Sequence, residues 1–172
     1  MFRESIAGWM MERPQSPCIK VCVLGSAGHC TGCLRTLDEI ATWGAMSAEQ
    51  QWAVVGALED RRRQVAEDVV NRIKTHISTN PAVLFMKGTP DFPQCGFSAQ
   101  AVAALRANGA NSFHAVNIFE DPELREALKK FSNWPTYPQL YVNGELVGGC
   151  DIVLDMHRSG ELKKILAEAG AS

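Results

Sequence analysis

The chain has 172 residues, 46% of them hydrophobic, which suits one ordinary domain or a small domain joined to a medium one. Its 17 basic and 19 acidic residues give a net charge of −2, so no strongly basic surface is available to bind nucleic acid. No apolar run approaches the roughly 20 residues that cross a bilayer, and residues 6–11 are too short for a signal peptide's apolar core. We therefore expect a cytoplasmic protein that binds neither nucleic acid nor membrane.

Six cysteines indicate two functional units. Thiols stay reduced in the cytosol, so metal binding or redox chemistry explains these cysteines better than structural disulfides do. Four of them lie within residues 18–33, whereas Cys95 and Cys150 stand alone much further along the chain. We predict a small four-cysteine domain over residues 14–63 and a second domain over residues 67–170.

Two helices are predicted after the cysteine cluster. Thr36 and Glu39 have the spacing of a capping box at the start of the first, which Gly44 would end. Ser47 and Gln50 repeat the capping pattern before the second helix. Its buried face would carry Trp52, Val55 and Leu58.

The basic run at residues 61–63 has acidic neighbours on both sides, so i,i+4 ion pairs on an exposed helix explain it better than nucleic acid binding does. Beyond this run, apolar residues continue at helical spacing almost to Pro81. They are Val65, Val69, Ile73 and Ile77. We therefore expect one nearly continuous helix to join the two domains.

From residue 82 the pattern alternates between strands and helices. Strands are predicted at 82–86, 113–118, 139–142 and 145–147, with Asn143-Gly144 as a hairpin turn between the last two. Helices are predicted at 95–108, from Asp121 to before Trp134, and near the C-terminus with an interruption at 159–160. In the middle helix, Leu124, Leu128 and Phe131 would face inward. This order predicts an α/β thioredoxin-like fold, a central mixed four-stranded sheet covered by helices and preceded by the small cysteine-rich helical domain.

Cys95 is placed where a loop becomes a helix, and the free N–H groups of a helix start stabilise a thiolate. Lys87, at the end of the first strand, could add a positive charge or bind a carboxylate. Ser98 stands where a Cys-x-x-Cys pair would have its second thiol. Thiol exchange at Cys95 would therefore need another thiol, from glutathione or from another cysteine of the fold.

Four motifs recur in order: MKGTP at 86–90, PQCGFS at 93–98, WPTYP at 134–138 and GGCD at 148–151. With them, residues 67–170 resemble the monothiol glutaredoxin family. The resemblance implies that Cys95 either reacts with glutathione mixed disulfides or ligates iron. It also implies that Lys87 binds the glycine carboxylate of glutathione, with Arg125 as a second basic contact.

The same resemblance assigns the rest of a glutathione site. The backbone of Thr136 and Tyr137 would pair with the cysteine of glutathione, and Pro138 would be the family's cis-proline. Cys150 and Asp151 would hold the γ-glutamyl end. Cys150 also fits a second role, a disulfide with Cys95 in the oxidised protein, although a glutathione contact is preferred.

Ligand counting connects this family to iron–sulfur chemistry. A [2Fe–2S] cluster usually needs four sulfur ligands, and this domain offers Cys95 alone, so two chains and two glutathiones would supply them. The resemblance thus implies a cluster-bridged homodimer that donates its cluster to iron–sulfur acceptor proteins, or a complex with a BolA-like partner. The alternatives are a weak glutathione-dependent oxidoreductase acting on protein–glutathione mixed disulfides, and a docking module whose second domain is a passive scaffold.

The N-terminal cysteines Cys18, Cys22, Cys30 and Cys33 place four thiolates within reach of one metal ion or cluster. Zinc is the general expectation for a small site of four cysteines. With the Ser16-Pro17 pair and the segment at 36–44, this unit resembles a small bacterial domain family of unknown function that is suspected of binding an iron–sulfur cluster. Zinc and a second iron–sulfur cluster both stay open.

Overall fold

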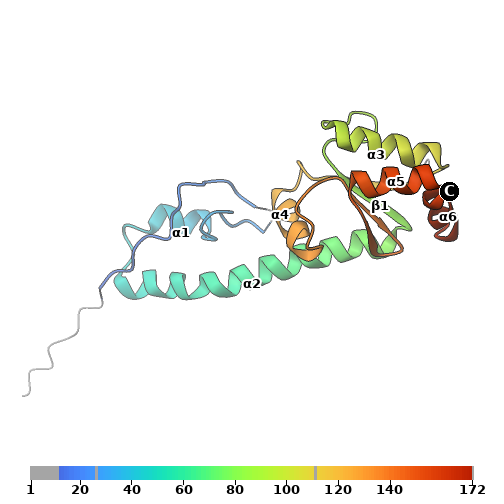
Figure 1. Cartoon of the computed structure of the whole chain (residues 1–172). Coiled ribbons are helices and arrows are strands. Elements are labelled where there is room, and N and C mark those ends of the chain that lie inside the picture. Colours follow the sequence, from blue (N-terminus) through green and yellow to red (C-terminus); the bar gives the residue numbers. More distant parts are fainter. Residues whose placement is uncertain (1–11, 26, 111, 172) are drawn as a thin grey trace, which may run out of the picture. The chain divides into compact units, whose positions relative to one another are not determined.

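The computed structural model describes residues 12–25, 27–110 and 112–171. The chain divides into two compact units between Ala66 and Glu67, and Figure 1 shows the elements of both. The apolar stretch at 6–11 lies outside the described residues. Within those that are described, no helix is long and apolar enough to cross a membrane.

The N-terminal unit contains helix α1 (Leu37–Thr42) and the first part of helix α2 (Ala48–Thr79). Both predicted capping boxes are present. Glu39 N–H donates to Thr36 Oγ1 at 3.1 Å, and Thr36 N–H donates to Glu39 Oε2 at 2.9 Å. Ser47 and Gln50 make the same reciprocal pair at 2.8 and 3.2 Å. Helix α2 is continuous through the point where the two units divide, as its apolar spacing predicts.

Two expectations about the N-terminal unit are wrong. Trp52 is exposed rather than buried, and its indole N–H donates to the Glu12 carbonyl at 2.8 Å, a bond that suits a ring lying along the surface. In the basic run, Arg63 pairs with Asp60 of the same exposed helix, three residues earlier rather than four, but Arg61 does not pair with a neighbour on its own helix. It forms a two-pronged ion pair with Glu39 of α1, because a guanidinium fork fits a carboxylate better than a single i,i+4 contact does.

The C-terminal unit is built on a four-stranded mixed sheet with the order β2-β1-β3-β4. The strands are β1 (Ala82–Met86), β2 (His114–Asn117), β3 (Gln139–Val142) and β4 (Glu145–Gly148). Strands β1 and β2 are parallel, whereas β3 is antiparallel to both β1 and β4. Asn143 and Gly144 both have positive φ, 51° and 82°, as a tight hairpin requires. The predicted thioredoxin-like fold is confirmed.

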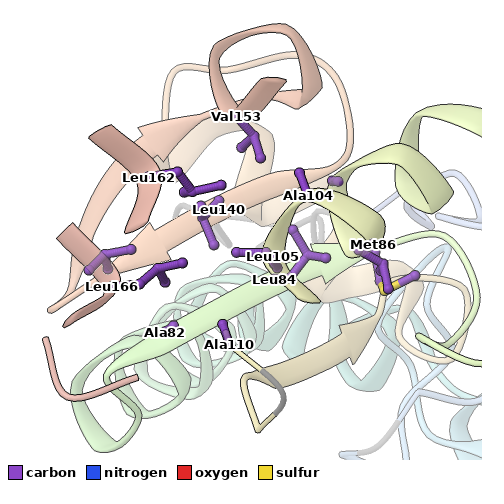
Figure 2. Packing of buried hydrophobic residues seen from close by; sticks show 13 residues of the cluster. Ala82, Leu84, Met86, Ala104, Leu105, Ala110, Leu140, Val153, Leu162 and Leu166 are labelled. Carbon is purple, nitrogen blue, oxygen red and sulfur yellow. The ribbon is translucent and has the colours of Figure 1, made fainter. Parts of the chain in front are cut away.

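Helices cover both faces of this sheet. Helices α3 (Gly96–Ala107), α5 (Cys150–Ser159) and α6 (Glu161–Glu168) pack on one face. Figure 2 shows Leu84 and Leu140 of the sheet meeting Leu105, Leu162 and Leu166 of these helices. On the other face, His76 of α2 makes an edge contact with the Phe85 ring.

Helix α4 (Pro122–Phe131) begins at Asp121, whose side chain accepts the Leu124 N–H at 2.9 Å. Leu124 and Leu128 are buried as expected, but Phe131 is 37% exposed. Phe131 is the last residue of the helix, where the chain turns away toward the Trp134 loop, so the inward stripe stops one turn earlier than predicted.

Candidate functional site

A cleft of about 570 Å³ in the C-terminal unit gathers the predicted site residues. Five segments line it: the end of β1, the start of α3, helix α4, the loop before β3 and the start of α5. The cleft brings together Lys87, Cys95, Arg125, Thr136, Tyr137, Cys150 and Asp151. Pro138 is buried beyond this lining, and the Tyr137–Pro138 peptide bond is cis, as the resemblance implies.

Cys95 is the N-cap residue of α3, with extended backbone angles (φ −155°, ψ 137°) and a partly exposed side chain. The main-chain N–H groups of Ser98 and Phe97 hold the pKa of the Cys95 thiol below its ordinary value, and the charge of Lys87 adds to this effect. Cys95 is therefore suited to be a thiolate, the form that attacks disulfides and ligates iron.

Ser98 fills the place of a second active-site thiol. The residue is fully buried, and its hydroxyl accepts the main-chain N–H of Lys87 at 3.2 Å. The side chain thus links the first turn of α3 to the residue that follows β1.

Three cations line the cleft, Lys87, Arg125 and Lys129. Arg125 of α4 is partly buried, and its guanidinium lies 5.7 Å from the centre of the Phe119 ring. The Tyr137 hydroxyl donates to the Arg125 carbonyl at 2.5 Å, which joins the loop before β3 to α4. Burial, followed by the charge of Glu126, raises the pKa of this phenol, so it stays a hydrogen-bond donor.

Lys129 and Trp134 also line the cleft. Neither is predicted as a site residue, although Trp134 begins the WPTYP motif. Lys129 follows Arg125 by four residues on α4, so helical spacing alone could have placed it on the same side. Its ammonium pairs with Glu126 at 2.9 Å. Trp134 Nε1 lies 3.1 Å from the position that a Cβ on Gly149 would occupy, so a larger residue there would press against the indole.

The start of α5 also lines the cleft, through Cys150 and Asp151. Asp151 is exposed, whereas Cys150 is buried, with its sulfur 3.6 Å from Gln100 Oε1. Burial raises the pKa of the Cys150 thiol, and the nearby charges of Asp151 and Cys95 raise it further. A cleft lined by both a carboxylate and cations would suit a ligand that carries an ammonium and carboxylates.

In the N-terminal unit, the segment that carries Cys18 and Cys22 contacts the segment that carries Cys30 and Cys33. Cys18 and Cys22 are exposed, and Cys30 and Cys33 are buried. The Cys30 thiol donates to the Val21 carbonyl at 2.9 Å. Gly32 lies so close to Val21 that a Cβ would stand 2.8 Å from its carbonyl oxygen.

The charges of these thiols affect one another. The pKa of Cys22 is raised, chiefly by the charge of Cys18, and Cys30 and Cys33 add to it. Over residues 12–25, 27–110 and 112–171, no three Cys, His, Asp or Glu side chains are already arranged to hold a metal ion. The donor set suits a soft metal centre, but the sulfurs would have to close around it, as ligands commonly do when metal binding completes a fold.

Comparisons with known proteins find a different family in each part of the chain. The Glutaredoxin family model matches residues 82–147, and the family described as a protein of unknown function (DUF1289) matches residues 16–62. The chain is 51% identical over 112 residues to monothiol glutaredoxin-5, mitochondrial, of Saccharomyces cerevisiae, which covers 64% of this chain and 75% of that protein.

Glutaredoxin 4 of Escherichia coli is 52% identical over 102 residues, covering 59% of this chain and 88% of that protein. The solution structure of reduced poplar apo GrxS14 is 46% identical, with a TM-score of 0.51 over 62% of this chain and 94% of that chain. These relatives align with only part of the chain, and the N-terminal unit has its own family match.

Proposed function

The chain belongs to the monothiol glutaredoxin family, and from this premise we propose that it binds a [2Fe–2S] cluster together with glutathione at Cys95 and passes the cluster to acceptor proteins. One observation carries the proposal. Cys95 is a partly exposed thiol with a lowered pKa, and its tetrad has the buried Ser98 in place of a second thiol. Such a sulfur can ligate iron but cannot complete a disulfide with its own motif.

The cleft supports glutathione as the co-ligand. Its volume of about 570 Å³ falls within the range of small-molecule sites. Lys87 and Arg125 would attract the glycine carboxylate of glutathione. Asp151 would accept the ammonium of the γ-glutamyl group, and the start of α5 would favour the neighbouring carboxylate. These contacts would direct the glutathione thiol toward Cys95.

The number of sulfur ligands sets the assembly. One chain and one glutathione supply two sulfurs, so a four-sulfur [2Fe–2S] cluster would bridge two chains in a homodimer. A BolA-like partner could replace one chain. Ligands that are not covalently part of the protein make such a cluster easy to release, which suits delivery to iron–sulfur acceptor proteins. We place this activity in the cytoplasm, where thiols are kept reduced.

A second function, glutathione-dependent oxidoreduction, is favoured by the lowered pKa of Cys95. The Cys95 thiolate would attack the glutathione sulfur of a protein–glutathione mixed disulfide and release the protein thiolate. A second glutathione thiolate would then attack that sulfur, freeing Cys95 and forming glutathione disulfide.

The N-terminal unit is proposed to hold a separate metal centre. The four thiols come from two segments that touch through Gly32 and Val21, and they form a soft donor set. Either zinc or an iron–sulfur cluster would bind as a tetrathiolate, with Cys18, Cys22, Cys30 and Cys33 as ligands.

The test is to measure iron, zinc and acid-labile sulfide per chain in full-length protein purified without oxygen and reconstituted with glutathione, together with its visible spectrum. Three proteins are compared: the unmodified chain, Cys95→Ser, and a variant with the four N-terminal cysteines changed to serine. We expect Cys95→Ser to lose a glutathione-dependent [2Fe–2S] spectrum that the N-terminal variant keeps. Equal iron and sulfide in the unmodified chain and Cys95→Ser would refute the carrier proposal.

A further inference from the structure

A buried guanidinium lies beside the N-terminal cysteines. Arg35 is only 2% exposed, and its guanidinium carbon lies 4.7 Å from the centre of the Trp43 ring. Its Nε donates to Cys33 Sγ at 3.5 Å. In the part of the chain that the structure describes, no Asp or Glu forms an ion pair with Arg35.

Among the residues that the structure describes, the Arg35 guanidinium therefore has no carboxylate as a counter-charge. A guanidinium stays protonated in proteins, and a buried charge is costly unless it is paired and hydrogen-bonded. Stacking on Trp43 compensates in part, because an aromatic face attracts a cation. Glu39, the acidic residue four positions after Arg35, is already held by Arg61 on both oxygens. The polar side-chain atom within hydrogen-bonding distance of Arg35 is the sulfur of Cys33.

The cysteines would supply the missing negative charge when they hold a metal. Four thiolates around Zn²⁺ or around a doubly positive [2Fe–2S] core leave an excess of two negative charges. A cation that donates to a ligand sulfur would lower the cost of burying that excess charge. Groups that hydrogen-bond to metal ligands in this way commonly stabilise a metal site from outside its ligand shell.

We propose that Arg35 is the charge partner of a metal–thiolate centre formed by the four N-terminal cysteines, and that it acts through its hydrogen bond to Cys33. This inference rests on the proposed four-cysteine centre and adds the residue that makes its burial favourable. Removing the positive charge should weaken metal binding roughly 10- to 100-fold, the usual cost of losing such a supporting group.

The test uses the full-length chain carrying Cys95→Ser, so that the metal retained belongs to the N-terminal cysteines. Into this parent are placed Arg35→Met, which keeps an unbranched side chain of similar length without its charge, and Trp43→Leu, which removes the stacking and keeps the charge. Arg62→Met, an exposed arginine on α2, is the matched control. Zinc, iron and acid-labile sulfide per chain are measured, followed by the rate of metal transfer to excess chelator.

We expect Arg35→Met to lose its metal roughly 10- to 100-fold faster than the parent, while Trp43→Leu and Arg62→Met stay close to it. Equal retention in Arg35→Met and Arg62→Met would overturn the inference. So would equal loss in Arg35→Met and Trp43→Leu, which would assign Arg35 to packing alone. A parent without metal would instead refute the four-cysteine centre itself, and the inference with it.

Circular dichroism of the metal-free proteins shows whether Arg35→Met folds. If it does not, Arg35→Lys decides, because lysine keeps the positive charge without the planar guanidinium. Metal retention in Arg35→Lys close to that of the parent supports a charge effect. If Arg35→Lys folds but loses its metal roughly 100-fold faster than the parent, the upper limit for a missing supporting group, the charge effect is overturned.

Discussion

The buried hydroxyl of Ser98 accepts a hydrogen bond from the main-chain N–H of Lys87 at 3.2 Å. This contact fixes the start of α3, which presents Cys95, against the end of β1, which presents Lys87. We expect Ser98→Ala to destabilise the C-terminal unit by about 1 kcal/mol, because the N–H of Lys87 loses its acceptor. Urea unfolding measures the change, with the exposed Ser112→Ala as control. Equal midpoints for the two variants would show that water satisfies the N–H.

Cys95 and Cys150 line the same cleft but should react very differently with iodoacetamide at pH 7. The thiolate is the reactive form, and the pKa is lowered at the partly exposed Cys95 and raised at the buried Cys150. We expect Cys95 to be modified at least about tenfold faster. Mass spectrometry of digested protein over a time course gives both rates. Similar rates would mean that Cys150 is far more accessible than its burial indicates.

Most of the C-terminal fold could be predicted because its signals are local. Asp121 with Pro122 marks a helix start, and Asn143-Gly144 marks a hairpin, whatever the rest of the chain does. The structure places a cap and a tight turn there. Burial at an element's end is less predictable, because it depends on neighbours distant in sequence. Phe131 has the right helical spacing yet is 37% exposed at the last residue of α4.

Site residues could be predicted when their side chain has a distinctive chemistry, as a cysteine does. They were harder to predict when a common side chain matters only because of where the fold places it. Cys95 stands out as a lone cysteine at a helix start, and the structure places it in a cleft with Asp151. Lys129 has no motif of its own, and its spacing of four residues from Arg125 was the only sequence signal that it lines the cleft. The ion-pair partner of Arg61 could not be predicted either, because Arg61 and Glu39 are 22 positions apart in the sequence.

The ion pair between Arg61 and Glu39 predicts how the stability of the N-terminal unit depends on pH. Hydrogen bonding from Arg61, offset by burial and aided by the Thr36 N–H, lowers the pKa of Glu39 from its ordinary 4.5 to about 2. A depressed carboxyl pKa adds stability above the unfolded-state value, and that stability is lost as the pH falls from about 4.5 toward 2. The pair should thus stabilise the unit fully at neutral pH and not at all in strong acid.

We therefore expect Glu39→Gln to destabilise the metal-free N-terminal unit by about 1–3 kcal/mol at pH 7 and by much less at pH near 2. Urea unfolding at several pH values measures this, with tryptophan fluorescence in a Trp134→Phe background so that the signal excludes the cleft. Asp38→Asn, an exposed neighbour on α1, is the control. A loss of stability in Glu39→Gln that is the same at every pH would contradict the assignment of the titration to Glu39.

The cleft charges predict which end of glutathione meets which residue. If Lys87 binds the glycine carboxylate, Lys87→Met should weaken glutathione binding roughly tenfold or more, the value of a charge-assisted hydrogen bond. The same substitution should hardly affect the binding of glutathione ethyl ester, in which that carboxylate is blocked. Asp151→Asn should weaken both ligands alike, because the γ-glutamyl ammonium is present in each.

Calorimetric titration in a Cys95→Ser background measures these affinities without covalent chemistry. Lys130→Met is the matched control, because Lys130 is exposed on α4 and does not line the cleft. If Lys87→Met weakens the binding of glutathione and of its ester equally, Lys87 does not bind the glycine carboxylate directly and acts only through the overall electrostatic attraction of the cleft. Asp151→Asn provides a separate check. If it changes the affinity for neither ligand, glutathione does not extend to the start of α5, and Cys150 would then be free for a different role.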